Sequence, residues 1–181
     1  MEGFSGMDGR TTIFDYWGVK SLQAWANHGK FDGAGMDDEQ RSLREFYQRL
    51  LTLARDNKAI SSGKMYDLEY AQGQGFNKHE QYAYLRKAGD EVLLIALNFD
   101  DRQVDMHINI PADAFVYMEQ EEIQRADAVD LLTDTVYPNL TFTASAPTCI
   151  TLPAWTGAIL RITPKAVRKT TTNKTKKTCK K

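Results

Sequence analysis

The spacing of apolar residues predicts two helices in the first third of the chain. The first runs over residues 19–27, where apolar side chains recur three or four positions apart. In the second helix, Asp37 is placed as the N-cap, Gln40 completes a capping box, and the last turn ends near Asp56. Its apolar stripe is wide and needs a substantial partner surface. The stripe consists of Leu43, Phe46, Tyr47, Leu50, Leu51 and Ala54.

From about Ser61 the apolar period changes from near 3.6 to 2, which predicts strands. Residues 92–99 are almost continuously apolar and should form a central strand, whereas residues 104–110 alternate cleanly and end at Pro111. The expected strands cover residues 64–70, 81–87, 92–99, 104–110, 128–132, 140–144, 148–152 and 158–162. We therefore expect a mainly β fold, an antiparallel two-sheet β-sandwich preceded by an N-terminal segment of about two helices.

The charged residues predict a third segment. The 181 residues carry a formal net charge of −1, but residues 165–181 contain eight Lys or Arg residues and no acid. This Lys/Thr-rich composition predicts a disordered basic tail. The rest of the chain has 15 basic and 24 acidic groups, which gives no electrostatic reason to bind nucleic acid or a membrane surface. The tail is consistent with non-specific nucleic-acid binding and equally with a solubilising role.

One carboxylate in the N-terminal part has surroundings suited to chemistry. Asp15 is flanked by Phe14, Tyr16 and Trp17, which would desolvate a carboxylate or stack on a sugar ring. The alternative is that Asp15 caps the helix beginning near residue 18. We favour the cap, because Asp is a frequent N-cap residue.

No pattern predicts a metal or cofactor. The three histidines, at positions 28, 79 and 107, are far apart in the sequence and lack the spacing of metal ligands on one element. Cys149 lies in an apolar run and is expected to be buried, while Cys179 lies in the tail.

Several aromatic residues suggest a second kind of site. They would form a sugar-stacking platform if the sandwich exposed them together. The alternative for Tyr82 and Tyr84 is a pair on one strand face with a packing role, which is commoner. The set comprises Trp17, Trp25, Tyr66, Tyr70, Tyr82, Tyr84 and Trp155.

The order of four segments resembles the C-terminal end of the alpha-amylase family, glycoside hydrolase family 13. The first segment is a Gly-rich loop followed by Gly-Arg-Thr-Thr-Ile-Phe-Asp-Tyr-Trp at residues 9–17. The second is the amphipathic helix with Leu-Arg-Glu-Phe-Tyr-Gln-Arg-Leu-Leu at 43–51. The third is the apolar strand that ends in Asn98-Phe99, and the fourth is the closing strand at 152–160. The resemblance covers roughly residues 1–164.

The resemblance implies a division of the chain and a function. Residues 1–60 would be the last part of a (β/α)8 catalytic barrel, 61–164 the C-terminal β-sandwich, and 165–181 the tail. Met1 would begin just past the last barrel strand. The family's catalytic carboxylates lie upstream of that point, so we expect this chain alone to be inactive. The whole protein would be a retaining hydrolase of α-glucans such as starch or maltooligosaccharides.

The resemblance also implies partners and outer site residues. Arg10, Asp15, Tyr16 and Trp17 match a loop at the rim of the barrel, where substrate loops gather, and are candidates for outer substrate contacts or loop packing. The barrel in cis would be the main partner. The helix face built on Phe46, Leu50 and Leu51 should lie partly against the sandwich and partly exposed, or dimerise. An independent carbohydrate-binding sandwich is the alternative function.

Overall fold

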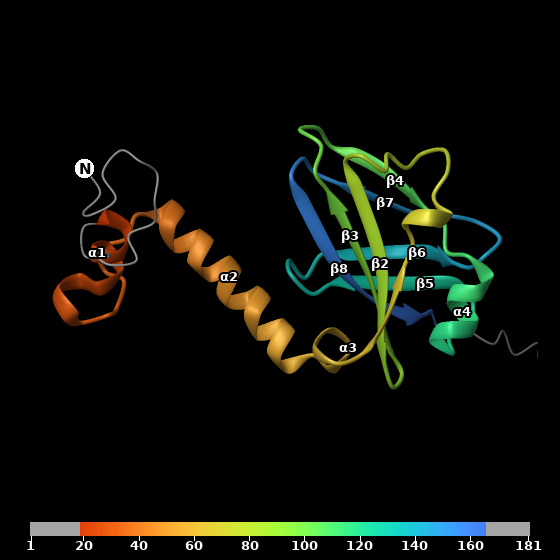
Figure 1. Cartoon of the computed structure of the whole chain (residues 1–181), viewed down its shortest axis with the longest axis horizontal. Coiled ribbons are helices and arrows are strands. Elements are labelled where there is room, and N and C mark those ends of the chain that lie inside the picture. The colour runs from red at the N-terminus through yellow and green to blue at the C-terminus, as the bar shows by residue number, and fades with distance from the viewer. Residues whose placement is uncertain (1–18, 166–181) are drawn as a thin grey trace, which may run out of the picture. The chain divides into compact units, whose positions relative to one another are not determined.

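The structure, a computed structural model, describes residues 19–165 (Figure 1). The chain divides into two compact units between Asn57 and Lys58.

The first unit begins with α1 (Lys20–Ala26) and the 3-10 turn η3 (Asn27–Gly29). The helix stops because Asn27 and His28 adopt left-handed backbone conformations, with φ of 40° and 55°. The loop that follows folds back on α1, and the rings of Trp25 and Phe31 lie 5.2 Å apart. The expected helix is therefore confirmed, but its N-cap is Val19, which has no side-chain acceptor. The prediction that Asp15 is the N-cap is wrong, and Asp15 itself lies outside the described residues.

The helix α2 (Asp38–Asp56) begins as the sequence predicts. The Gln40 backbone N–H donates to the Asp37 carboxylate at 2.8 Å, and the Asp37 N–H donates to the Gln40 side chain at 3.3 Å. No residue of α2 is buried. On its apolar stripe Phe46 is 49% exposed and Leu51 is 64% exposed, while Leu50 is half-buried.

The second unit is the expected antiparallel sandwich, and the predicted fold class is confirmed (Figure 1). One sheet has six strands in the order β1-β2-β3-β8-β5-β6, and the other pairs β4 with β7. All eight predicted strands are present, with shifted ends at several of them. Their bounds are β1 Lys64–Asp67, β2 Gln81–Ala88, β3 Glu91–Asn98, β4 Val104–Ile108, β5 Ile123–Asp130, β6 Val136–Phe142, β7 Thr148–Leu152 and β8 Thr156–Pro164.

The central position predicted for residues 92–99 is also confirmed. The strand β3 lies between β2 and β8 and is buried on both faces. Leu94 belongs to the main core between the sheets, together with Met106 of β4 and Leu160 of β8. Leu93 is on the opposite face and is fully buried as well. This two-sided burial explains why the run is continuous rather than alternating.

Three short helical elements of the second unit, within residues 58–165, were not predicted from the sequence: α3 (Lys58–Ser61), η4 (Glu69–Ala71) and α4 (Ala112–Met118). The helix α4 buries Phe115 and Met118, and the Phe115 ring meets Phe142 edge to face at 5.4 Å. Each of the three has fewer than eight residues, too few for a helical period to stand out. None of the helices within residues 19–165 has the length and apolarity needed to cross a bilayer.

The prediction that Cys149 is buried is wrong. In β7, Thr148, Ile150 and Leu152 face the interior, so the alternation places Cys149 on the outer, exposed face. Its register partner across the ladder is His107, which is exposed on the polar face of β4.

Gly63, just before β1, lets the backbone carbonyl oxygens of Ala59 and Lys87 lie close to its Cα, and this generates a stability prediction. A Cβ at Gly63 would lie 2.5 Å from the carbonyl oxygens of both Ala59 and Lys87, and backbone oxygens cannot turn aside. We expect Gly63→Ala to lower the free energy of unfolding by about 1–3 kcal/mol. Gly73→Ala is the matched control, because a Cβ there meets nothing closer than 3.8 Å. Urea denaturation of both variants checks this, and equal stabilities would contradict it.

Candidate functional site

The rim residues predicted from the sequence cannot be placed. Arg10, Asp15, Tyr16 and Trp17 lie outside the described residues, and so does the tail beyond Lys165.

Within the second unit, the structure does not bring the predicted aromatic residues together as one platform. Tyr82 and Tyr84 lie on one face of β2 with their rings 5.6 Å apart and half-buried, which confirms the packing alternative. Trp25 is half-buried against Phe31 in the first unit. Trp155 lies in the turn between β7 and β8 and is 69% exposed.

Tyr66 and Tyr70 form a separate polar cluster with Asp113 of α4. The hydroxyls of both tyrosines donate to the same Asp113 carboxylate oxygen, that of Tyr70 at 2.8 Å. The Tyr117 ring packs 5.6 Å from Tyr66, and the Lys64 ammonium lies 5.6 Å from the centre of the Tyr117 ring. The polar groups of this cluster are hydrogen-bonded to one another. The cluster links β1, η4 and α4, which is a structural role.

Charge and burial shift two pKa values in this cluster in opposite directions. The hydrogen bonds from Tyr66 and then Tyr70 hold the pKa of Asp113 below its ordinary value of 3.8. Desolvation, with the bond to Asp113 second, raises the pKa of Tyr66 well above its usual range. The Asp113 carboxylate is therefore held in its ionised form and the Tyr66 phenol in its neutral form.

A shallow depression lies at the end of the sandwich where β3 finishes and β8 begins. Its volume is about 520 Å³. Trp155 contributes an exposed indole from one turn, and Phe99, 53% exposed, contributes a ring from the end of β3. Polar side chains complete the lining, namely Glu80, Asp100, Asp101 and Arg102.

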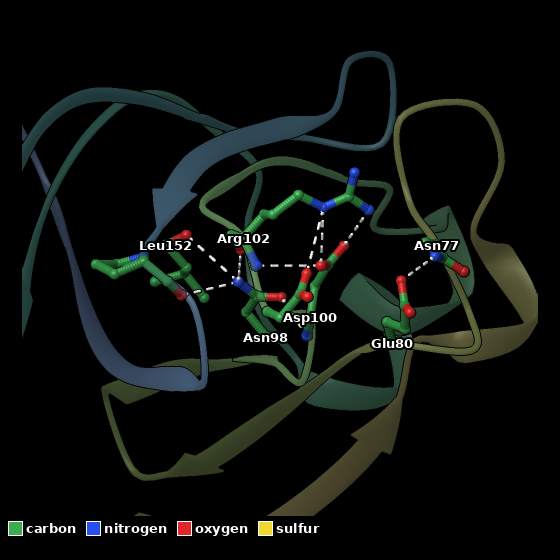
Figure 2. A network of polar contacts seen from close by, with 8 residues as sticks. Asn77, Glu80, Asn98, Asp100, Arg102 and Leu152 are labelled. Atoms are coloured by element: carbon green, nitrogen blue, oxygen red, sulfur yellow. Dashed lines mark hydrogen bonds and ion pairs between the residues drawn. The ribbon is translucent and has the colours of Figure 1, made fainter.

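Asn98, the last residue of β3, fastens the two turns that form this depression (Figure 2). Its amide nitrogen donates to the carbonyl oxygens of Arg102 at 2.9 Å and Pro153 at 2.8 Å. Its side-chain oxygen accepts from the Asp100 N–H at 3.0 Å. Since Asn98 is only 1% exposed, this buried amide fixes both turns from beneath.

The backbone of Trp155 is held in an uncommon conformation by the same network. The Trp155 N–H donates to the Asp100 carbonyl oxygen at 3.1 Å, and the residue has a φ of 53°. A bulky residue at positive φ is unusual, because its Cβ approaches the backbone closely. The surrounding hydrogen bonds therefore fix the backbone from which the indole projects.

The charges of the depression are mostly negative. The Arg102 guanidinium bonds the buried Asp100 carboxylate at 3.3 and 3.4 Å and approaches Asp101 at 3.4 Å (Figure 2). These contacts lower the pKa of Asp100 and raise that of Arg102. With Glu80, the lining of the depression holds three carboxylates and one guanidinium. No cluster of three or more His, Cys, Asp or Glu side chains suited to a metal ion occurs between Val19 and Lys165.

Sequence reasoning missed most of the residues that build this depression. The sequence Asn98-Phe99-Asp100-Asp101 was visible as a turn at a strand end. Nothing in it showed that the turn would meet the turn carrying Trp155, because β3 and β8 pair only in three dimensions. Trp155 itself was named among the exposed aromatics.

Comparison with known proteins gives the class of the fold. No sequence-family profile matches the chain. Among solved structures, it is similar to AmyP in complex with maltose, with a TM-score of 0.51 at 19% identity over 73% of this chain. It is also similar to an Anoxybacillus alpha-amylase, with a TM-score of 0.51 at 15% identity over 76% of this chain.

A third similar structure is the alpha-amylase GTA from Geobacillus thermoleovorans, complexed with acarbose, with a TM-score of 0.51 at 15% identity. This chain spans 23–27% of the length of these three proteins. At such identities the likeness concerns the fold. The fold is one found within alpha-amylases, as the resemblance in the sequence predicted.

The Asn98 network generates a stability prediction. Asn98→Ala leaves two turn carbonyls and the Asp100 N–H without their partner, so we expect a loss of about 1–3 kcal/mol in the free energy of unfolding. Gln103→Ala, at an exposed position in the same turn, should change it by less than about 0.5 kcal/mol. Chemical denaturation measures both. Indistinguishable variants would show that the amide does not hold the turns.

The tyrosine cluster generates a prediction of pH dependence. A carboxylate whose folded pKa is lowered stabilises the fold above its unfolded pKa, and this contribution is lost as the pH falls below about 3.8 and through the folded pKa. Replacing both Tyr66 and Tyr70 with Phe removes the donors, so the loss of stability between about pH 7 and pH 3 should be smaller than in the wild type.

Urea titrations at the two pH values measure that difference. Tyr47→Phe, which changes an exposed tyrosine on α2, is the control and should keep the wild-type pH dependence. A double variant with an unchanged acid sensitivity would contradict the role assigned to Asp113.

Proposed function

We propose that this chain is the non-catalytic C-terminal portion of an alpha-amylase-type glycoside hydrolase that acts on α-glucans such as starch or maltooligosaccharides. The observation that carries the proposal is the shared fold, which matches alpha-amylases over about a quarter of their length. The ordered sequence segments point to the same part of the enzyme. In this proposal residues 1–60 complete the catalytic barrel, 61–164 form the C-terminal sandwich, and 165–181 form a tail.

The exposed apolar stripe of α2 supports the proposal that another surface covers this helix in the whole protein. Leu43 is 59% exposed and Tyr47 is 54% exposed, in addition to Phe46 and Leu51 on the same helix. The helix has a capping box at its start and a regular stripe, so its sequence favours a stable amphipathic helix that needs a surface to cover it. In the proposal this surface belongs to the barrel in cis.

The chemistry would be supplied by that barrel. A retaining glycosidase needs two carboxyl groups about 5–5.5 Å apart, one as nucleophile and one as acid and base. The proposal assigns neither role to a residue of this chain. Arg10, Asp15, Tyr16 and Trp17 would contribute outer substrate contacts or loop packing at the barrel rim.

The proposal predicts that the isolated 181-residue chain does not hydrolyse starch. Reducing ends released from soluble starch should stay at the level of a protein-free blank, since the chain contributes no catalytic carboxylate. The gene upstream of Met1 should encode an in-frame barrel, and the product of that longer reading frame should be active. Hydrolysis by the short chain, or an upstream region without a barrel, would overturn the proposal.

Oligomeric state provides an independent check on α2. A chain that lacks its barrel should bind a dye specific for apolar surface, or cover the stripe by dimerising. Sedimentation velocity, with Leu43→Ser plus Leu51→Ser as the test variant, separates these two outcomes. A wild-type monomer without dye binding would contradict the role assigned to the stripe.

A further inference from the structure

The depression at Trp155 has features that a purely structural module does not require. An indole that is 69% exposed makes little contribution to packing, yet the backbone beneath it is held at positive φ by hydrogen bonds. We infer that this depression is a binding site for an α-linked glucan chain.

The two rings of the depression provide the stacking surface. Trp155 precedes β8, and Phe99 follows β3. The last residue of β3, Asn98, pairs in register with Thr156 at the start of β8, so the two rings come from neighbouring strand ends. One face of a glucose ring carries C–H groups that are attracted to the electron-rich face of an indole. A stacked sugar would therefore replace water over apolar surface without any charge on the ligand.

The polar lining suits the hydroxyl groups of a sugar. Carboxylates accept hydrogen bonds from hydroxyls, and charge-assisted bonds of this kind are stronger than neutral ones. Asp101 is exposed in the lining of the depression, and the half-buried Glu80 accepts a hydrogen bond from the Asn77 side chain at 2.7 Å and keeps further acceptor capacity. Arg102 presents a donor whose orientation is set by Asp100 (Figure 2). The site therefore offers acceptors and donors around an apolar surface.

The net negative charge of the depression disfavours anionic ligands. Three carboxylates against one guanidinium repel phosphate, so a nucleotide or nucleic acid would be disfavoured despite the aromatic rings. A neutral polyhydroxyl ligand meets no such repulsion. The choice of an α-glucan among neutral sugars rests on the proposed function, which makes such chains the substrate of the whole enzyme.

The binding site is organised before the ligand arrives. Asn98 fixes both turns, and the Thr156 hydroxyl donates to the Pro153 carbonyl oxygen at 2.8 Å within the turn that carries Trp155. A turn that is already ordered loses little conformational entropy on binding. A second depression, of about 370 Å³, is lined in part by Pro153 and Thr156 of the same turn.

Calorimetric titration of the 181-residue chain with maltoheptaose tests the inference. We expect a dissociation constant on the order of 1 mM for the wild type, and a weakening of at least about tenfold in Trp155→Asn. Asn is chosen because it tolerates positive φ, so the turn is kept while the ring is removed. Trp155→Phe should retain part of the affinity, because it keeps a stacking surface.

Two controls give the experiment its specificity. Tyr70→Ala removes a ring that is 62% exposed elsewhere on the sandwich and should leave binding unchanged. Cellohexaose, a β-linked chain of glucose units, should bind more weakly than maltoheptaose. Unchanged binding in Trp155→Asn, no binding by the wild type at about 10 mM maltoheptaose, or equal binding of cellohexaose would each overturn the inference.

These outcomes are separable from the failure of the proposed function. Hydrolysis and the upstream reading frame decide whether the chain belongs to an amylase-type enzyme, and neither depends on Trp155. Loss of binding in Trp155→Asn with no upstream barrel would instead support an independent carbohydrate-binding module that uses the same depression.

Discussion

The sandwich depends on the burial of β3 on both faces. A strand that is apolar throughout cannot lie at a sheet edge or face water on one side, so β2 and β8 must flank it. This fixes which turns meet at its C-terminal end. The Asn98 side chain then donates to carbonyl oxygens of both turns, and the Trp155 N–H donates to the Asp100 carbonyl oxygen between them. The position of the candidate site is therefore a consequence of where the most apolar segment has to lie.

Elements with a strong local signal could be predicted from the sequence. The capping box of Asp37 and Gln40 predicted the first residue of α2, and the strand expected at residues 148–152 has the same bounds as β7. The short helix α4 was missed, because its seven residues show less than two full turns of periodicity. Cys149 was assigned to the wrong face because its neighbours are apolar, whereas strand alternation decided its side.

The candidate site was less predictable than the fold. Trp155 could be named as an exposed aromatic, but its relation to Phe99, Asp100 and Arg102 depends on the pairing of β3 with β8. Pairing between strands some 60 positions apart leaves no local trace in the sequence. The depression combines residues from three separate turns or strand ends, and only the folded chain shows that they share a surface.

The left-handed backbone of Trp155 has a consequence for engineering. Glycine adopts this conformation without steric cost, whereas a residue with a Cβ at such a φ is disfavoured by about 1–2 kcal/mol. The turn would therefore tolerate, and for stability alone prefer, a residue with no ring at all. Selection for thermostable variants of this chain would therefore favour replacement of Trp155. Such a replacement would raise stability and, at the same position, remove the ring proposed to bind a ligand.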